Sequence, residues 1–133
     1  MEPERFFTEA ARWAAGEPAV RALLLVGSWA RGANRPDSDI DLMVLTDERE
    51  KFLDDPGCFS RFGEISRQSV EQYGRCTSVR VFYAGGPEVE FGLADSGWAS
   101  LPLDPGTRQV LAGGFRILVD KCHIADGIAN LYG

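Results

Sequence analysis

Cysteine, histidine and long apolar runs are all scarce in this chain, which has three cysteines and one histidine. Cys58, Cys76 and Cys122 are widely spaced and form no Cys-x-x-Cys pair, so we expect reduced thiols rather than disulfides or a zinc site. The longest apolar stretch, 22–26, is far shorter than the roughly 20 residues that span a bilayer, so no membrane partner is expected. The first residues, 1–5, are acidic and lack the apolar core of a secretory signal, which predicts a cytoplasmic protein.

Basic residues are also in the minority, because 14 Lys and Arg stand against 20 Asp and Glu, giving a formal net charge of −6. An acidic surface repels phosphate backbones, so we expect no nucleic-acid partner, and a small or cationic substrate fits better. The hydrophobic share of 44% and the charged share of 26% are typical of a globular protein rather than a disordered one. At 133 residues, the chain is expected to form a single domain, 1–133, around one core.

Hydrophobic patterns and turn residues divide the chain into short helices and strands. Apolar residues at helical spacing predict an amphipathic helix over 3–15, and alternation around a Gly-Gly-Pro turn predicts a β-hairpin of strands 78–84 and 88–94. The segment 62–73 is interpreted as an irregular strand, with a short helix as the alternative. The other expected elements are strands over 20–26, 40–46 and 115–119, helices over 47–53, 107–112 and 123–131, and a short helical turn after Ser28. Together they predict an α+β fold, with a mixed β-sheet covered by helices.

Two carboxylates, Asp39 and Asp41, stand at the start of the strand expected over 40–46, which is apolar on both faces beyond Asp41 and should be central in the sheet. Residues two apart on a strand point to the same face with Cα atoms about 6.6 Å apart, so these two side chains can converge. Mg²⁺ prefers oxygen ligands of this kind, together with phosphate oxygens and water. Two surface acids at a strand start would show the same spacing, so the pair alone leaves both interpretations open.

A glycine-serine turn precedes the two carboxylates. Gly27 lets the backbone approach a phosphate closely, and the Ser28 hydroxyl and the N–H groups that follow it can donate to phosphate oxygens. Arg31 adds a positive charge that would assist. A serine-capped turn between a strand and a helix would carry the same residues without any ligand, and the spacing of a Walker loop is absent.

The combined string G-S-x-A-R-G-x5-S-D-x-D-L, over residues 27–42, resembles the signature of the nucleotidyltransferase superfamily related to DNA polymerase beta. It looks most like minimal nucleotidyltransferase domains and streptomycin-type aminoglycoside adenylyltransferases, and the strand pattern around 89–93 extends the resemblance over most of the chain. The resemblance implies a nucleotidyltransferase-like fold and an adenylyltransferase-like enzyme. Its reaction would be the Mg²⁺-dependent transfer of a nucleoside monophosphate, usually AMP from ATP, to a hydroxyl of an acceptor, with release of pyrophosphate.

The resemblance also implies roles for individual residues. In these families a third carboxylate faces the first two from a neighbouring strand, and Glu90 stands at that position between Val89 and Phe91, which should point into the core. Asp39, Asp41 and Glu90 would therefore be the catalytic and metal-binding residues, with Glu90 acting either as a metal ligand or as the general base. The nucleotide-binding residues would be Gly27, Ser28, Arg31 and Ser38.

Several further residues have weaker roles in this hypothesis. Ser38 is expected to orient the loop before the carboxylates, and Glu88 and Glu64 are secondary candidates for the general base. His123, the single histidine, is expected to be structural or exposed, because nothing in the sequence places it near the carboxylate strands. Trp29 would pack either beside the nucleotide or in the rim of the core.

The acceptor side of the reaction is where the resemblance falls short. The aminoglycoside enzymes append a helical domain that helps bind the antibiotic, whereas residues 91–133 are expected to finish the sheet. We therefore expect the acceptor, a small molecule or a protein, to be bound with help from a helical partner protein or a second copy of the chain. The alternative is a non-catalytic nucleotide-binding module, or an antitoxin-like partner of a two-component system.

Overall fold

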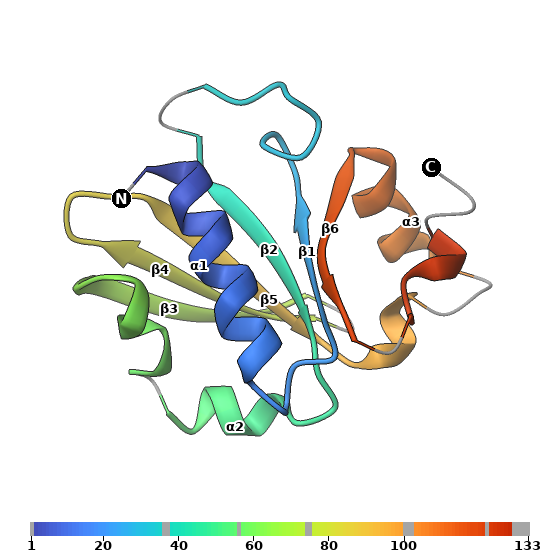
Figure 1. Ribbon diagram of the computed structural model, residues 1–133, viewed down its shortest axis with the longest axis horizontal. Coiled ribbons are helices and arrows are strands. Elements are labelled where there is room, and N and C mark those ends of the chain that lie inside the picture. The colour runs from blue at the N-terminus through green and yellow to red at the C-terminus, as the bar shows by residue number, and fades with distance from the viewer. Residues whose placement is uncertain are drawn as a thin grey trace.

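A computed structural model describes residues 2–35, 38–55, 57–73, 76–99, 103–121 and 123–128. The described residues form one six-stranded mixed sheet in the order β3-β4-β5-β2-β1-β6, with helix α1 lying across one face (Figure 1). The strands are β1 (Ala22–Val26), β2 (Ile40–Leu45), β3 (Ile65–Tyr73), β4 (Cys76–Tyr83), β5 (Glu88–Ala94) and β6 (Phe115–Asp120). The helices are α1 (Pro3–Gly16), α2 (Arg49–Leu53) and α3 (Pro105–Ala112), with 3-10 helices η1 (Cys58–Phe62) and η2 (Ser96–Ala99). This architecture confirms the α+β fold expected from the sequence.

The strand pairing places β2 in the interior of the sheet, as its two apolar faces predicted. β2 runs parallel to β5 on one side and antiparallel to β1 on the other. β3, β4 and β5 form an antiparallel meander, which contains the expected hairpin, and β6 pairs antiparallel with the outer side of β1. The parallel pair β2–β5 therefore joins the β1–β2–β6 half of the sheet to the meander.

An aromatic cluster between α1 and the sheet forms the larger core. Phe6 and Trp13 of α1 are buried, as the helical spacing predicted. Trp13 meets Phe59 and Phe62 edge to face, and the rings of Phe59 and Phe91 stack with their centroids 4.0 Å apart. Ring pairs of this kind contribute about 0.5–1.5 kcal/mol beyond the burial of their area. The cluster joins α1 and η1 to the strand that also carries Glu90.

The opposite face of the sheet carries a smaller core. Leu24 of β1 and Met43 of β2 pack there with Trp98 of η2 and Leu111 of α3. Along β4 and β5, residues that point to this face alternate with residues buried on the α1 face. Many of the residues that point to this face are polar. The two faces of the sheet thus differ: α1 and its aromatic residues cover one, whereas the other is partly covered and partly polar.

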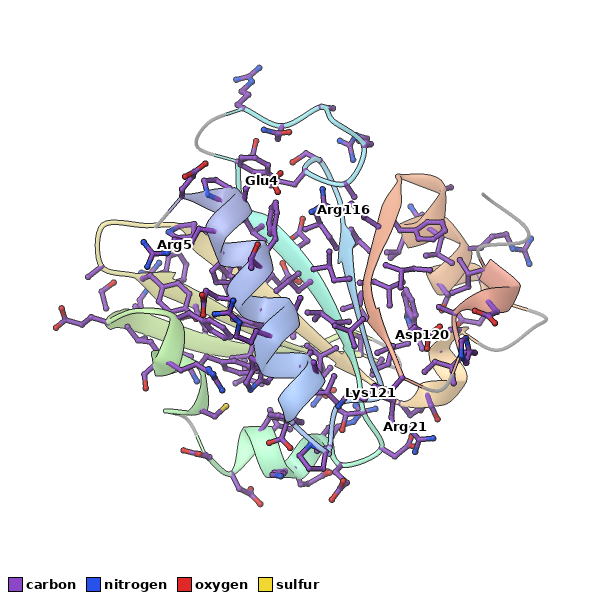
Figure 2. All side chains as sticks on the ribbon, viewed as in Figure 1. Glu4, Arg5, Arg21, Arg116, Asp120 and Lys121 are labelled. Carbon is purple, nitrogen blue, oxygen red and sulfur yellow. The ribbon has the colours of Figure 1, made fainter. Side chains whose placement is uncertain are left out.

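Charged side chains connect α1 and the residue that follows it to the β6 edge of the sheet (Figure 2). A guanidinium nitrogen of Arg116 on β6 lies 3.7 Å from a carboxylate oxygen of Glu4 on α1. The ammonium group of Lys121, directly after β6, donates to the backbone oxygen of Glu17 at 2.7 Å. Exposed ion pairs contribute only about 0–1 kcal/mol, so the Arg116–Glu4 pair adds little to the stability supplied by the buried face of α1.

Several local expectations have clear outcomes. The segment 62–73 is mainly strand β3, as favoured, preceded by η1. The segment after Ser28 forms consecutive hydrogen-bonded turns over residues 28–32 and does not continue into a helix. Of the helix expected over 123–131, residues 126–128 are helical and 129–131 lie outside the described residues.

Cys58 and Cys76 are free thiols, whereas Cys122 lies outside the described residues. Among the described residues, no helix is long and apolar enough to cross a membrane.

Replacing Phe91 by alanine should destabilise the protein by about 3–5 kcal/mol, because the ring is fully buried in the aromatic cluster and its loss leaves a cavity. The measurement is urea unfolding followed by tryptophan fluorescence. Val70→Ala on β3 is the control, since this side chain is 53% exposed and should cost no more than about 0.5 kcal/mol. Equal losses in the two variants would contradict this assignment of the core.

Candidate functional site

Asp41 and Glu90 lie side by side on the polar face of the sheet. In the parallel register of β2 and β5, Asp41 pairs with Glu90. Their neighbours Ile40 and Val89 are fully buried on the α1 side, so the two carboxylates project to the opposite face. Asp39 lies just before β2 rather than within it, and it approaches the same face from the loop. The three carboxylates named from the sequence therefore gather at one place.

Gly27 forms the wall beside Asp41. Its φ of +78° is a backbone conformation that favours glycine. A Cβ atom at this position would lie 2.5 Å from Oδ2 of Asp41, which is closer than real Cβ contacts. The N–H groups of Ala30 and Arg31 donate to the Gly27 oxygen at 3.1 and 3.3 Å, which closes the turn. The glycine of the motif thus permits a close approach of backbone to carboxylate.

The other predicted nucleotide-binding residues lie around this turn. Ser28 accepts the N–H of Ala33 at its backbone oxygen, 3.0 Å away, within the same turn. Arg31 extends across to the end of α3, where Nη1 donates to the backbone oxygen of Gly113 at 3.3 Å. Both residues border the site, and Arg31 also lines the cavity between the sheet and α3.

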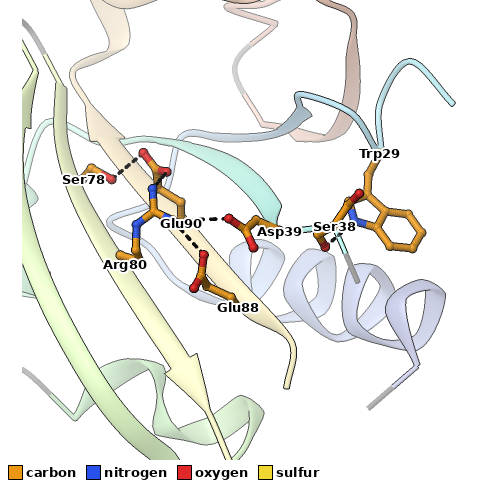
Figure 3. A network of polar contacts seen from close by, with 7 residues as sticks. All are labelled: Trp29, Ser38, Asp39, Ser78, Arg80, Glu88 and Glu90. Atoms are coloured by element: carbon orange, nitrogen blue, oxygen red, sulfur yellow. Dashed lines mark hydrogen bonds and ion pairs between the residues drawn. The ribbon is translucent and has the colours of Figure 1, made fainter. Parts of the chain in front are cut away.

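Ser38 and Trp29 fix the loop that leads into β2. The Ser38 hydroxyl accepts the backbone N–H of Arg35 at 2.7 Å, and the indole N–H of Trp29 donates to the Ser38 backbone oxygen at 3.0 Å. The Trp29 ring packs edge to face on Phe7 of α1, with centroids 5.8 Å apart. Trp29 therefore belongs to the rim of the core, and Ser38 orients the loop in front of Asp39, as its position predicted (Figure 3).

Arg80 is the residue that the sequence analysis missed. It lies on β4 directly opposite Glu90 and contacts three carboxylates at once (Figure 3). Its Nη2 is 2.7 Å from Glu90 Oε2, and its Nη1 is 2.8 Å from Glu88 Oε2 and 3.4 Å from Asp39 Oδ2. The Ser78 hydroxyl donates to the other Glu90 oxygen at 2.7 Å. The signal that could have found Arg80 was its alternation with Val79 and Val81, which placed it on the Glu90 face of the hairpin.

The gathered carboxylates disturb one another. Burial raises the pKa of Asp41 to about 6, and the negative charges of Glu90 and Asp39 add to the increase. The pKa of Glu88 is also raised, first by a hydrogen bond shared with Asp39 and then by partial burial, while Arg80 opposes the change. The surroundings of Asp41 and Glu88 thus disfavour their charged forms, in part because other carboxylates lie close by.

The donor set fits a hard divalent cation in its chemistry. Carboxylate oxygens are the ligands that Mg²⁺ prefers, and the Arg80 guanidinium is a positive charge already held among them. Within the described ranges, no three His, Cys, Asp or Glu side chains are arranged to close around a metal ion as they stand. The oxygens of Asp39 and Glu90 instead face Arg80. Asp39, Asp41 and Glu90 are the residues that could hold a metal ion here.

A cavity of about 770 Å³ opens beside the carboxylates, between the sheet and α3. Gly27, Arg31, Asp41 and Glu90 are among the residues that line it. Its apolar lining includes Val26, Met43, Gly92, Trp98 and Val110. This volume is in the range of small-molecule sites, about 300–1,000 Å³. The arrangement can accommodate a small organic molecule next to a charged, cation-attracting edge.

Two weaker candidates lie apart from this cluster. Glu64 is exposed just before β3, at the edge of the sheet. His123 is 79% exposed, and its Nδ1 lies 3.4 Å from Asp126, which confirms the expected surface position. Of the secondary candidates, Glu88 alone joins the contacts of the carboxylate network described here.

The titration of Asp41 should be visible in the pH dependence of stability of the metal-free protein. Because the pKa in the folded state is about 6 rather than 3.8, folding binds the Asp41 proton more tightly. This stabilising contribution is fully present below about pH 3.8 and is lost as the pH rises through about 6. Asp41→Asn should remove that loss, so its free energy of unfolding should exceed the wild-type value more at pH 7 than at pH 4.5.

Urea unfolding at the two pH values measures this difference. Asp54→Asn, at the exposed end of α2, is the matched control and should follow the wild type. An identical pH dependence in Asp41→Asn and the wild type would contradict the raised pKa.

Similarities to known proteins, in sequence and in fold, indicate the family of this chain. The nucleotidyltransferase domain family matches residues 9–90, more than half of the chain. The fold is similar to that of an aminoglycoside 6-adenyltransferase from Bacillus subtilis, with a TM-score of 0.55 and 14% identity over 71% of this chain and 35% of that one. It is also similar to the polymerase core of TRAMP, an RNA surveillance complex, with a TM-score of 0.51 and 17% identity over 67% of this chain and 30% of that one. The chain thus matches about a third of each structure. No curated protein matches its sequence.

The structural likenesses, at these identities, show a shared fold. The family match is more specific, since its range contains the Gly27 turn and all three carboxylates and ends at Glu90 itself. The family expected from the motif over 27–42 is therefore confirmed. By its fold and by the match over residues 9–90, the chain belongs to the family of nucleotidyltransferase domains.

Proposed function

We propose that this nucleotidyltransferase transfers a nucleoside monophosphate, AMP from ATP, to a hydroxyl of a small molecule or a partner protein in a Mg²⁺-dependent reaction that releases pyrophosphate. The observation that carries the proposal is the gathering of Asp39, Asp41 and Glu90 on one sheet face, next to a glycine turn without a side chain. In this proposal the reaction takes place in the cytoplasm. The net charge of −6 supports an acceptor other than a nucleic acid.

Some of the residues would bind the metal ion, and others would position the nucleotide. Asp39, Asp41 and Glu90 would hold Mg²⁺, whose charge would neutralise the triphosphate and assist the departure of pyrophosphate. The Gly27–Ser28 backbone would approach the phosphates closely and donate N–H groups to their oxygens, with Arg31 beside them. The neighbouring cavity would give the nucleoside or the acceptor a place next to the reacting phosphate.

The contacts of Glu90 favour a ligand role over a role as general base. The Ser78 hydroxyl donates to one Glu90 oxygen at 2.7 Å, which fixes the orientation of the carboxylate, while its second oxygen, the one that Arg80 contacts, faces the cluster. Hydrogen bonds from neighbouring residues to a ligating carboxylate are a common way to orient metal ligands. Ser78 would therefore be a positioning residue for Glu90.

The acceptor would be bound with the help of further protein. The polar sheet face beside the carboxylates is only partly covered by α3 and η2. A helical partner protein or a second copy of the chain would supply the remaining groups. The alternative function, a non-catalytic nucleotide-binding or antitoxin-like module, is favoured by one observation, the occupation of Asp39 and Glu90 by Arg80.

Transfer should depend on the carboxylates. Asp41→Asn and Glu90→Gln should each lower pyrophosphate release by about 100-fold or more, because a lost ligand costs several kcal/mol of charge stabilisation. The assay combines the protein, Mg²⁺ and each labelled nucleoside triphosphate with a cell lysate as the source of acceptors. Glu64→Gln, exposed and outside the carboxylate cluster, is the control and should remain fully active.

The same assay separates the two functions. Absence of pyrophosphate release under all acceptor conditions would reject the transferase proposal. Mg²⁺-dependent triphosphate binding, measured by calorimetry in such an inactive protein, would favour the non-catalytic module.

A further inference from the structure

Arg80 occupies the position in which the proposed metal ligands would otherwise meet a cation. The strand register brings it there, since Arg80 pairs with Glu90 across β4–β5 and Glu88 lies two residues before Glu90. Its guanidinium contacts Asp39 and Glu90, two of the three proposed ligands, as well as Glu88. A single arginine thus bridges three carboxylates that come from two separate elements.

This arrangement creates a competition. An oxygen of Glu90 that accepts a hydrogen bond from Arg80 at 2.7 Å is less available to a metal ion. A divalent cation placed among the same carboxylates would also be repelled by the guanidinium charge at short range. Metal binding by the protein alone must therefore displace Arg80 from its partners.

The guanidinium has both room to move and a second class of partner. The Arg80 side chain is 31% exposed, and its three partners are 25–46% exposed, so the network lies at the open side of the site. Arginine binds phosphate oxygens in the same forked geometry that it uses for carboxylates. A triphosphate bound at Gly27 would bring such oxygens to the carboxylate cluster.

We propose that Arg80 is a built-in counter-ion, which competes with the metal for the carboxylates and is transferred to the phosphates of the arriving nucleotide. Metal and nucleotide then bind cooperatively, because each favours the position of Arg80 that the other requires. This inference rests on the proposed function for the identity of its two ligands. Arg80 would then be a positioning residue for both ligands. Its contacts with Asp39 and Glu90, which taken alone favour a non-catalytic module, would instead control when the metal binds.

The direction of one measurement separates this role from a purely structural one. If Arg80 competes with the metal, Arg80→Met should tighten Mn²⁺ binding to the nucleotide-free protein by about tenfold, a coupling of ordinary size. If Arg80 merely holds the carboxylates in place, the same substitution should weaken Mn²⁺ binding. Mn²⁺ is used as the probe because its binding can be followed directly by electron paramagnetic resonance, without any reaction.

The variants are chosen to separate charge from position. Arg67→Met removes the same charge from the same sheet, where the guanidinium lies 4.1 Å from the centre of the Phe82 ring, and should leave Mn²⁺ affinity at the wild-type value. Arg80→Lys keeps the charge with a more compact group and should give an intermediate affinity. Circular dichroism and thermal unfolding confirm that each variant is folded before it is compared.

Cooperativity is tested with a triphosphate analogue that cannot transfer its nucleotide. In the wild type, the analogue should tighten Mn²⁺ binding by about tenfold more than it does in Arg80→Met. Mn²⁺ affinity that is unchanged or weaker in Arg80→Met, or Mn²⁺ binding to neither protein, would overturn the inference.

The outcomes also distinguish this inference from the proposed function. A protein that shows the Mn²⁺ shift but transfers no nucleotide keeps the counter-ion role and loses the transferase proposal. A protein that transfers nucleotide but whose Mn²⁺ affinity does not respond to Arg80→Met loses the counter-ion role alone.

Discussion

The parallel pairing of β2 with β5 is the constraint on which the rest of the site depends. These two strands are separated in sequence by α2, η1 and the β3–β4 hairpin, yet their register sets Asp41 directly beside Glu90. Because the neighbouring residues of both strands are anchored in the α1 core, a shift by one residue would turn the carboxylates inward and the apolar side chains outward. The aromatic cluster that holds Phe91 in place therefore also determines where the charges lie.

The electrostatics of the site follow from that pairing. Bringing carboxylates together on a partly buried face is costly, and the raised pKa of Asp41 is one sign of this cost. The protein offsets part of it with one cation of its own, Arg80, drawn from the strand on the other side of β5. In the mechanism proposed above, a metal ion and Arg80 would be alternative counter-charges for the same carboxylates, and the arriving nucleotide would exchange one for the other.

Much of this organisation was predictable from local patterns, and the limits of those patterns are physical. Helical spacing identified α1, and alternation identified the β4–β5 hairpin and the face on which Glu90 lies. The motif around Gly27 and Asp41 identified the family. Alternation, however, gives the face of a residue and says nothing of which strands become neighbours across the sheet. The contact of Arg80 with Asp39 requires the order β4-β5-β2, a long-range pairing that no local signal contains. For the same reason, the sequence left the role of Glu90 open between metal ligand and general base, and it could not show the hydrogen bond from Ser78 on which the proposed ligand role rests.

The close approach of Gly27 to Asp41 has a consequence for how this site can vary. A carboxylate can be exchanged for an amide of nearly the same shape, so substitutions among the charged residues alter chemistry while sparing the fold. Position 27 allows no such graded change, because any side chain meets both an unfavourable backbone conformation and the Asp41 oxygen. The site therefore depends at position 27 on the absence of a side chain, because even alanine there would strain the turn and press on Asp41.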